Sequence, residues 1–370
     1  MSASTRPHRR RLARSGLLAA AVATAAVALP QPAAALDPPV AFWTEANGKA
    51  VNGTYTPVVG NFAGSPQDDI YWYAPGPGGD HLWLSNGDST FSDVDGEPQV
   101  NGSYTPLVGD FAGSDHEDIF WYAPGPAPDH LWTSLGDGTF YSQIRSVSGT
   151  YEPVVLDDLA GKDDIVWARP GGGIGYVWSF EGVGNYISTT MSSPTGSRPL
   201  VGHFGPGSCA DIFWYAPGAG MDSLWFMNCA GHAGTTVTQA VGGTYQPTVE
   251  RYSPNGDALD DILWHRPDGS SYVWASNGDG TFSSTAHSIP LAGTVIPAAK
   301  SWGFAHVFST TAQDLVFWDQ GGPDDWTAPL TNTQFGSGYV PVTGAFVGAE
   351  TDVFWYKPGG APERLFFHTA

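Results

Sequence analysis

Charged residues are scarce in this chain of 370 residues, since they make up 14% of it against about 25% in an average soluble protein. Basic residues are the scarcer sign, because 15 Lys and Arg stand against 36 Asp and Glu, which gives a formal charge of −21 at pH 7. A surface this acidic repels nucleic-acid phosphates and anionic membranes. We therefore expect neither nucleic acid nor an anionic membrane as a partner.

Long hydrophobic runs are also missing, except near the N-terminus. There the basic segment RPHRRRLARS precedes the apolar run GLLAAAVATAAVAL, and Ala33-Ala34-Ala35 follows. The run of about 14 residues is shorter than the ~20 needed to span a bilayer. This order of segments predicts a signal peptide over residues 1–35 and a secreted, extracellular protein that begins near Leu36. The export route, general secretory or twin-arginine, stays open.

Cysteine is nearly absent, with two residues in the whole chain. Neither Cys209 nor Cys229 has the companion ligands of a zinc site. One pair in an exported chain predicts a disulfide. The two residues are equally distant from the centre of a predicted hairpin, so they should face each other across it.

Enzyme signatures are missing as well. The chain has no G-x-S-x-G, no H-E-x-x-H and no phosphate-binding glycine loop before a helix. We assign no catalytic residue and favour a non-catalytic protein. Catalysis by scattered polar residues stays open as an alternative.

Glycine, proline and aromatic residues, in contrast, are abundant. The chain holds 48 Gly and 30 Pro, which interrupt nearly every stretch long enough for a helix. Aromatic residues make up 13%, including 15 Trp, so there is ample apolar surface for a core. The composition predicts an all-β protein with many short strands and tight turns.

An internal repeat organises the chain. The segment DDIYWYAPG at 68–76 recurs as DIFWYAPG (118–125), DIVWARPG (164–171), DIFWYAPG (211–218), DILWHRPD (261–268), DLVFWDQG (314–321) and DVFWYKPG (352–359). Seven copies spaced by 38 to 53 residues fit the period of propeller blades.

Each copy contains four strand-like runs, represented by TPVVGNF, DDIYWYA, HLWLS and a weaker run near TFSDV. Hairpin signals such as Asn86-Gly87-Asp88 separate the third run from the fourth. We predict one four-stranded antiparallel blade per copy and a seven-bladed β-propeller over residues 36–370, with repeats of about 48 residues. The last copy lacks a fourth run, so residues before the first copy should supply that strand and close the ring.

The repeat pattern G-[DN]-F-x-G-x(2–3)-[DE]-D-I resembles the FG-GAP or VCBS repeat of integrin α-subunit heads and of bacterial secreted proteins. The resemblance covers residues 37–370 and implies a seven-bladed propeller with calcium in the loop between strands one and two. Most loops here have Ala or Gly at ligand positions. The fifth copy comes nearest to the calcium pattern, and its candidate ligands are Ser253, Asn255, Asp257 and Asp261. We expect no required cofactor and Ca²⁺ at one or two degenerate loops at most.

Tryptophans at one position of the second run, and at one position of the third, are expected to be packing elements. Ligand contact is predicted on the face formed by the YAPG loops, where Tyr offers a flat ring and a hydroxyl and Asp and His offer hydrogen bonds. The candidate residues are Tyr73, Asp80, His81, Tyr122, Asp129, His130, Tyr215 and Asp222. The alternative is that the YAPG segment only builds a stiff turn.

These features favour a secreted, monomeric, lectin-like protein that binds carbohydrate or another cell-surface polymer. Two other classes stay open. One is an extracellular polysaccharide lyase or glycosidase, and the other is an adhesion protein that binds protein, by analogy with integrins.

Overall fold

A computed structural model describes residues 43–96, 98–158, 161–250, 259–266, 270–288, 294–296, 304–309, 314–319, 339–348, 352–360 and 362–368. The predicted signal peptide lies outside these ranges. The described residues form 27 strands and no helix. No helix among them is long and apolar enough to cross a membrane.

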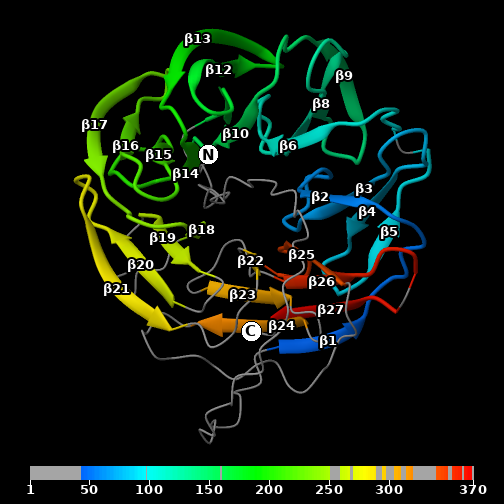
Figure 1. The fold of residues 1–370 in the computed structure, drawn as a ribbon. Coiled ribbons are helices and arrows are strands. Elements are labelled where there is room, and N and C mark those ends of the chain that lie inside the picture. Colours follow the sequence, from blue (N-terminus) through cyan, green and yellow to red (C-terminus); the bar gives the residue numbers. More distant parts are fainter. Residues whose placement is uncertain are drawn as a thin grey trace, which may run out of the picture.

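The strands form separate antiparallel sheets arranged in a ring, so the fold is a β-propeller (Figure 1). In most blades the first strand lies near the centre of the ring and the fourth at its rim (Figure 1). Blade 1 consists of β2 (Thr56–Gly60), β3 (Asp69–Tyr73), β4 (His81–Ser85) and β5 (Phe91–Asp93). Blade 2 consists of β6 (Thr105–Gly109), β7 (Asp118–Tyr122), β8 (Asp129–Ser134) and β9 (Phe140–Arg145).

Blades 3 to 5 repeat the same strand order. Blade 3 consists of β10 (Glu152–Leu156), β11 (Asp164–Ala168), β12 (Gly173–Gly182) and β13 (Asn185–Ser193). Blade 4 consists of β14 (Arg198–Gly202), β15 (Asp211–Tyr215), β16 (Asp222–Met227) and β17 (Ala233–Gln239). Blade 5 consists of β18 (Gln246–Glu250), β19 (Asp261–His265), β20 (Ser270–Ser276) and β21 (Phe282–Ser288).

The two ends of the chain meet in one sheet, which we call the closing blade. β25 (Val340–Gly344), β26 (Asp352–Tyr356) and β27 (Arg364–His368) are followed in the sheet by β1 (Trp43–Asn47). β1 pairs with β27 from Trp43↔His368 to Asn47↔Arg364. The N-terminal strand therefore supplies the outer strand of the last copy, as the sequence predicts.

The expectation of seven four-stranded blades is corrected by the described residues, which contain six such blades. The sixth copy forms a three-stranded sheet of β22 (Thr294–Ile296), β23 (Phe304–Ser309) and β24 (Asp314–Asp319). Among the described residues, the cognate of the second run, β24, pairs on one side only, with β23. In sequence, Trp318 stands where blades 1, 2 and 4 and the closing blade carry a tyrosine whose hydroxyl joins neighbouring blades, and blades 3 and 5 depart there too, with Ala168 and His265.

The core lies between blades and is aromatic. The second-strand tryptophans are at most 1% exposed, which confirms their packing role, and they are Trp72, Trp121, Trp167, Trp214, Trp264 and Trp355. Trp121 shows the pattern: its ring lies 5.0 Å from Tyr73 of blade 1 and 5.4 Å from Trp132 of its own blade. Burial of each large ring against the preceding blade holds the blades together through the hydrophobic effect.

Acidic pairs at the start of the second strands fix the backbone. The first acid binds the preceding blade, as when Asp163 Oδ2 accepts a hydrogen bond from the Asp110 amide at 2.9 Å. The second acid binds its own blade, as when Asp118 accepts from the amides of Ala112 and Ser134 at 2.8 Å each. The repeated acidic pair is therefore a framework element of the ring.

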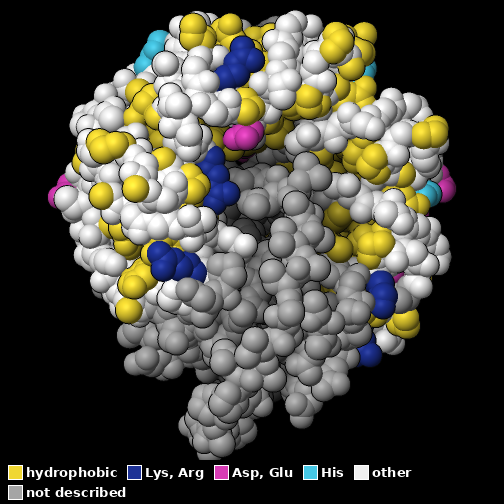
Figure 2. All heavy atoms as spheres, viewed as in Figure 1, with side chains coloured by type: hydrophobic (Ala, Val, Ile, Leu, Met, Phe, Trp, Pro, Cys, Tyr) yellow, Lys and Arg dark blue, Asp and Glu magenta, His cyan; other side chains and the backbone are white. Residues whose placement is uncertain are grey.

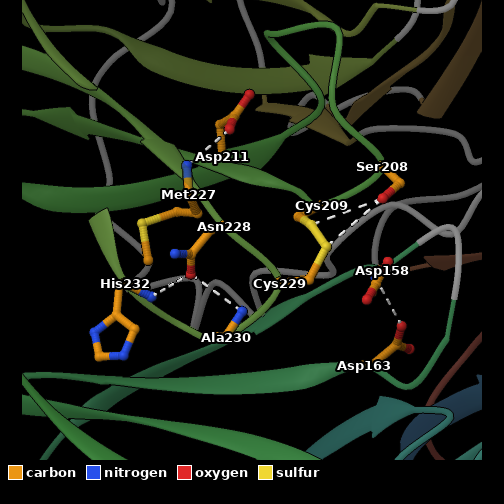
Figure 3. The surroundings of a disulfide bond; sticks show 10 residues. All are labelled: Asp158, Asp163, Ser208, Cys209, Asp211, Met227, Asn228, Cys229, Ala230 and His232. Atoms are coloured by element: carbon orange, nitrogen blue, oxygen red, sulfur yellow. Dashed lines mark hydrogen bonds between the residues drawn. A yellow bond between two sulfur atoms is a disulfide. The ribbon is translucent and has the colours of Figure 1, made fainter. Parts of the chain in front are cut away.

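The predicted disulfide between Cys209 and Cys229 is present (Figure 3). Its Cα atoms lie 5.3 Å apart at the ends of the β15–β16 hairpin, as the symmetry of the hairpin predicts. Cys209 also forms an isolated β-bridge with Asp158 of the preceding blade. The disulfide thus closes blade 4 where its first loop meets blade 3.

Candidate functional site

Two sets of loops project from opposite faces of the ring. Antiparallel order places the loops between strands one and two, and between three and four, on one face. The loops between strands two and three, and those leading from strand four to the next blade, lie on the other, which we call the YAPG face. On this face the two kinds of loop are joined by glycine bridges, namely Gly76↔Gly102, Gly125↔Gly149 and Gly218↔Gly243.

The predicted tyrosines of this face are buried and join neighbouring blades. Tyr73, Tyr122 and Tyr215 are at most 1% exposed. The Tyr73 hydroxyl donates to the Gly102 carbonyl at 2.6 Å and accepts from the Tyr104 amide at 2.9 Å, and both partners lie in the next blade's approach loop. Tyr122 and Tyr215 make the same two bonds. The side chains of these tyrosines therefore join neighbouring blades in this structure.

The predicted aspartates occupy a similar framework position. Asp80, Asp129 and Asp222 are fully buried. Asp80 accepts a hydrogen bond from the Ala74 amide at 2.8 Å and another from the Val100 amide at 2.7 Å. Asp129 and Asp222 repeat both bonds. These carboxylates hold the two loops together, and their oxygens face backbone donors instead of solvent.

The predicted histidines lie at the surface of the same face. His81 is exposed and His130 is half-buried. The His81 ring lies 5.8 Å from the half-buried Tyr55 ring, and the His130 ring lies 5.8 Å from the half-buried Tyr104 ring, both edge to face. Two blades thus present the same Tyr–His pair.

The tyrosine of this pair has a hydroxyl able to bind a ligand. The hydroxyls of Tyr55 and Tyr104 make no hydrogen bond within the described ranges. Burial, and to a lesser extent the nearby Asp80, raises the pKa of Tyr55 above its ordinary value, and burial with Asp129 does the same for Tyr104. Both hydroxyls therefore stay protonated at neutral pH and can donate as well as accept.

Two further blades present a related pair that the sequence reading missed. Tyr151 lies 6.2 Å from Tyr176 in blade 3, and Tyr245 lies 6.4 Å from Tyr272 in blade 5. The second ring always lies opposite the second-strand tryptophan in the sheet register, at His81, His130, Tyr176 and Tyr272. The first ring always ends the motif [NSG]-G-[TS]-Y. Alignment of the copies at that motif could have found it.

A glycine makes room for the first ring. Gly102 has φ of 153°, and a Cβ atom there would lie 2.6 Å from the Tyr104 ring. Gly149 and Gly243 repeat this close approach to Tyr151 and Tyr245. The recurring glycine therefore lets each tyrosine fold back over its own loop.

The opposite face holds the predicted calcium loops. Ser253, Asn255 and Asp257 lie outside the described residues, whereas Asp261 is buried and accepts a hydrogen bond from the Ser276 amide at 2.8 Å. In blade 2, Asp110 accepts from the amides of Gly113, Ser114 and Asp115. Asp110 thus binds amides of its own loop, as in turns stabilised by Asx side chains, whereas Asp261 binds an amide at the end of the third strand.

Burial has a large effect on the second-strand acids. It raises the pKa of Asp69 to about 7 and that of Asp118 to about 8, and it raises the pKa of Asp164 and of Asp211 to about 6. The backbone donors around each carboxylate act in the opposite direction, with a smaller effect than burial. These groups therefore titrate near neutral pH.

The surface seen along the ring axis is weakly charged for so acidic a chain. Figure 2 shows hydrophobic side chains exposed in several blades and few Asp and Glu among the described residues of that face. Exposed apolar side chains beside uncharged polar groups suit the apolar faces and the hydroxyls of a saccharide.

Comparisons with known proteins agree with the fold. No protein-family model matches the chain, and no curated protein matches it either. A solved structure of an Agrocybe aegerita lectin, described as recognising non-reducing terminal N-acetylglucosamine, superposes with a TM-score of 0.56 at 16% identity over 76% of this chain and 81% of that one. A BBS1N structure in complex with ARL6DN superposes with a TM-score of 0.53 at 10% identity over 89% of this chain and 98% of that one.

Proposed function

We propose that the protein is a secreted, non-catalytic lectin that binds carbohydrate at repeated sites on the YAPG face. The observation that carries this proposal is the pair of a half-buried tyrosine and a surface histidine, present at the same place in blades 1 and 2. The likeness to the lectin structure supports it at the level of the fold.

The chemistry of the pair fits a sugar. The apolar face of a pyranose packs on an aromatic ring, while its hydroxyls need donors and acceptors at the ring edge. Tyr55 and Tyr104 offer a ring and a protonated hydroxyl, and His81 and His130 add a nitrogen that donates or accepts. Repetition gives several weak sites on one rigid face, so a polymer with repeated units would bind through avidity.

The same reasoning extends to the whole chain. We propose that the sheet of β22–β24 belongs to a seventh blade and that the repeats are of the FG-GAP or VCBS kind. The disulfide between Cys209 and Cys229 is compatible with export. Export with cleavage near Leu36 remains part of the proposal, and mass spectrometry of the exported protein would identify the first residue.

A glycan array run beside a reducing-sugar assay tests the proposed function. We expect binding to one class of glycan without release of reducing ends. The double variant His81→Ala, His130→Ala should lose at least about tenfold in affinity, because the polar partner of each tyrosine is removed.

The matched control carries two substitutions on the opposite face, Ser114→Ala and Glu181→Gln, at exposed positions in a one–two loop and a three–four hairpin. It should bind as the unmodified protein does. Release of reducing ends would favour the glycosidase or lyase class, and equal losses in both double variants would show that the YAPG face is not the site.

A further inference from the structure

Three blades carry a cation at a position where three others carry alanine. The position after the second strand is Ala74, Ala123 and Ala216 in blades 1, 2 and 4. In blades 3 and 5 and the closing blade it is Arg169, Arg266 and Lys357. Basic residues are scarce, since only ten of the 15 lie beyond residue 35, so three at one repeat position on one face are a marked concentration.

Each of these cations lies over the ring of the approach-loop tyrosine. Arg169 lies 5.0 Å from the centre of the Tyr151 ring, and Arg266 lies 4.4 Å from that of Tyr245. Lys357 lies 5.0 Å from the centre of the Tyr339 ring. A cation over an aromatic face is attracted by the ring quadrupole and is held in place without a carboxylate.

No acid of the described residues pairs with these three side chains. The lysine and arginine ion pairs within those ranges join Lys49 to Asp93 and Arg364 to Glu45. Arg169 is exposed, and Arg266 and Lys357 are half-buried. Their positive charge is therefore open to a ligand, and a guanidinium fork matches the two oxygens of a carboxylate or sulfate.

We propose that the sites with Arg169, Arg266 and Lys357 bind the acidic groups of an anionic saccharide, whereas the Tyr–His sites of blades 1 and 2 bind neutral sugar units. This inference rests on the proposed carbohydrate-binding function. It assigns to the ring two kinds of site, and the cation at the position after the second strand distinguishes the anionic kind. The shared chemistry of the ligand is an anionic group on a sugar, a carboxylate or a sulfate.

The experiment measures binding to three immobilised polymers near physiological salt. Polygalacturonate presents carboxylates, dextran sulfate presents sulfates, and unmodified dextran is neutral. We expect binding to at least one anionic polymer. The triple variant Arg169→Ala, Arg266→Ala, Lys357→Ala should weaken it by about tenfold or more, because charge-assisted hydrogen bonds are lost.

The variant should fold, because alanine is the natural residue at this position in three other blades. The conservative variant Arg169→Lys, Arg266→Lys should keep most of the binding. The reciprocal variant Ala74→Arg, Ala123→Arg should strengthen it. Lys162→Ala removes one charge from a one–two loop on the opposite face and should change nothing.

The outcomes separate the two proposals. The proposal of two kinds of site would be overturned if the triple variant bound the anionic polymers as tightly as the unmodified protein does. It would also be overturned if Lys162→Ala weakened that binding as much as the triple variant does. Glycan binding confined to neutral sugars would overturn this inference and leave the proposed function standing. A lack of binding to any saccharide, on these surfaces and on the array, would overturn both.

Discussion

The acids and tyrosines that recur from blade to blade bind backbone, and the residues proposed to contact a ligand are their less conspicuous neighbours. Asp80 and Tyr73 are buried, while His81 beside Asp80 is exposed. Adjacent residues of a strand point to opposite sides, so a framework residue and a surface residue can share one dipeptide. The Asp-His pairs show this division at single-residue resolution.

The hydrogen bonds of the Tyr122 hydroxyl to the approach loop of the next blade can be tested by removing that hydroxyl. Tyr122→Phe leaves the Gly149 carbonyl and the Tyr151 amide without the partner that lies 3.0 and 2.9 Å away. We expect a loss of about 1–3 kcal/mol in the free energy of unfolding, measured by urea denaturation, with glycan affinity unchanged. Tyr141→Phe, at a position 55% exposed, is the control and should leave stability as it is. A loss of affinity without a loss of stability would return Tyr122 to the ligand site.

The buried second-strand acids predict an unusual pH dependence. Burial raises the pKa of Asp69 to about 7 and of Asp118 to about 8, above the ordinary value near 4. Between pH 4 and these raised pKa values, the two acids bind more protons in the folded protein than in the unfolded chain, so their contribution to stability is complete below about pH 4 and is lost as the pH rises to about 8. Melting temperatures from pH 5 to 8.5 should fall, and Asp118→Asn should make the slope shallower. A rise over this range would mean that the acids are ionised in the fold.

At the scale of the elements, the disulfide joins the ends of one hairpin. Cys209 and Cys229 are separated by 20 residues. The double substitution to serine should reduce the free energy of unfolding by roughly 3 kcal/mol in the chain-entropy model. Thiol titration of the denatured, unreduced protein should find no free thiol. Two free thiols, or a serine variant as stable as the original, would contradict this role.

The strands could be predicted from sequence because each run has a strong local pattern. Second strands are apolar on both faces and start with an acid, and turns such as Asn86-Gly87-Asp88 separate strands three and four. The pairing of β1 with β27 could be predicted because the last copy lacks a fourth strand-like run and residues remain before the first copy. In the sixth copy, residues 320–338 after β24 lie outside the described residues, so the sheet described there has three strands.

The candidate site was predicted only in part. Recurrence pointed to the loops where the candidate site lies, but it cannot separate a residue that joins blades from one that is exposed at the surface. Tyr73 and Tyr104 are both repeated, and only the fold shows that Tyr73 is buried beneath the next blade while Tyr104 reaches the surface. Burial depends on contacts between blades, which no single copy of the repeat encodes.

At the scale of the whole molecule, the ring is held by contacts between its blades. The closing blade is joined to blade 1 by the same kind of tyrosine. The Tyr356 hydroxyl donates to the Gly53 carbonyl at 2.9 Å and accepts from the Tyr55 amide at 2.8 Å. The Asp110 carboxylate, in a degenerate calcium-type loop, accepts backbone N–H bonds. A chelator should therefore lower the melting temperature by only a few degrees. Complete unfolding in chelator would show that calcium is essential to the ring.

The most direct test of the account is the crystal structure of the protein with a saccharide that it binds on the array. We predict that the sugar lies on the YAPG face, against the rings of Tyr55 and His81 or of Tyr104 and His130. A sugar bound only at the loops between the first and second strands, on the opposite face, would contradict the account.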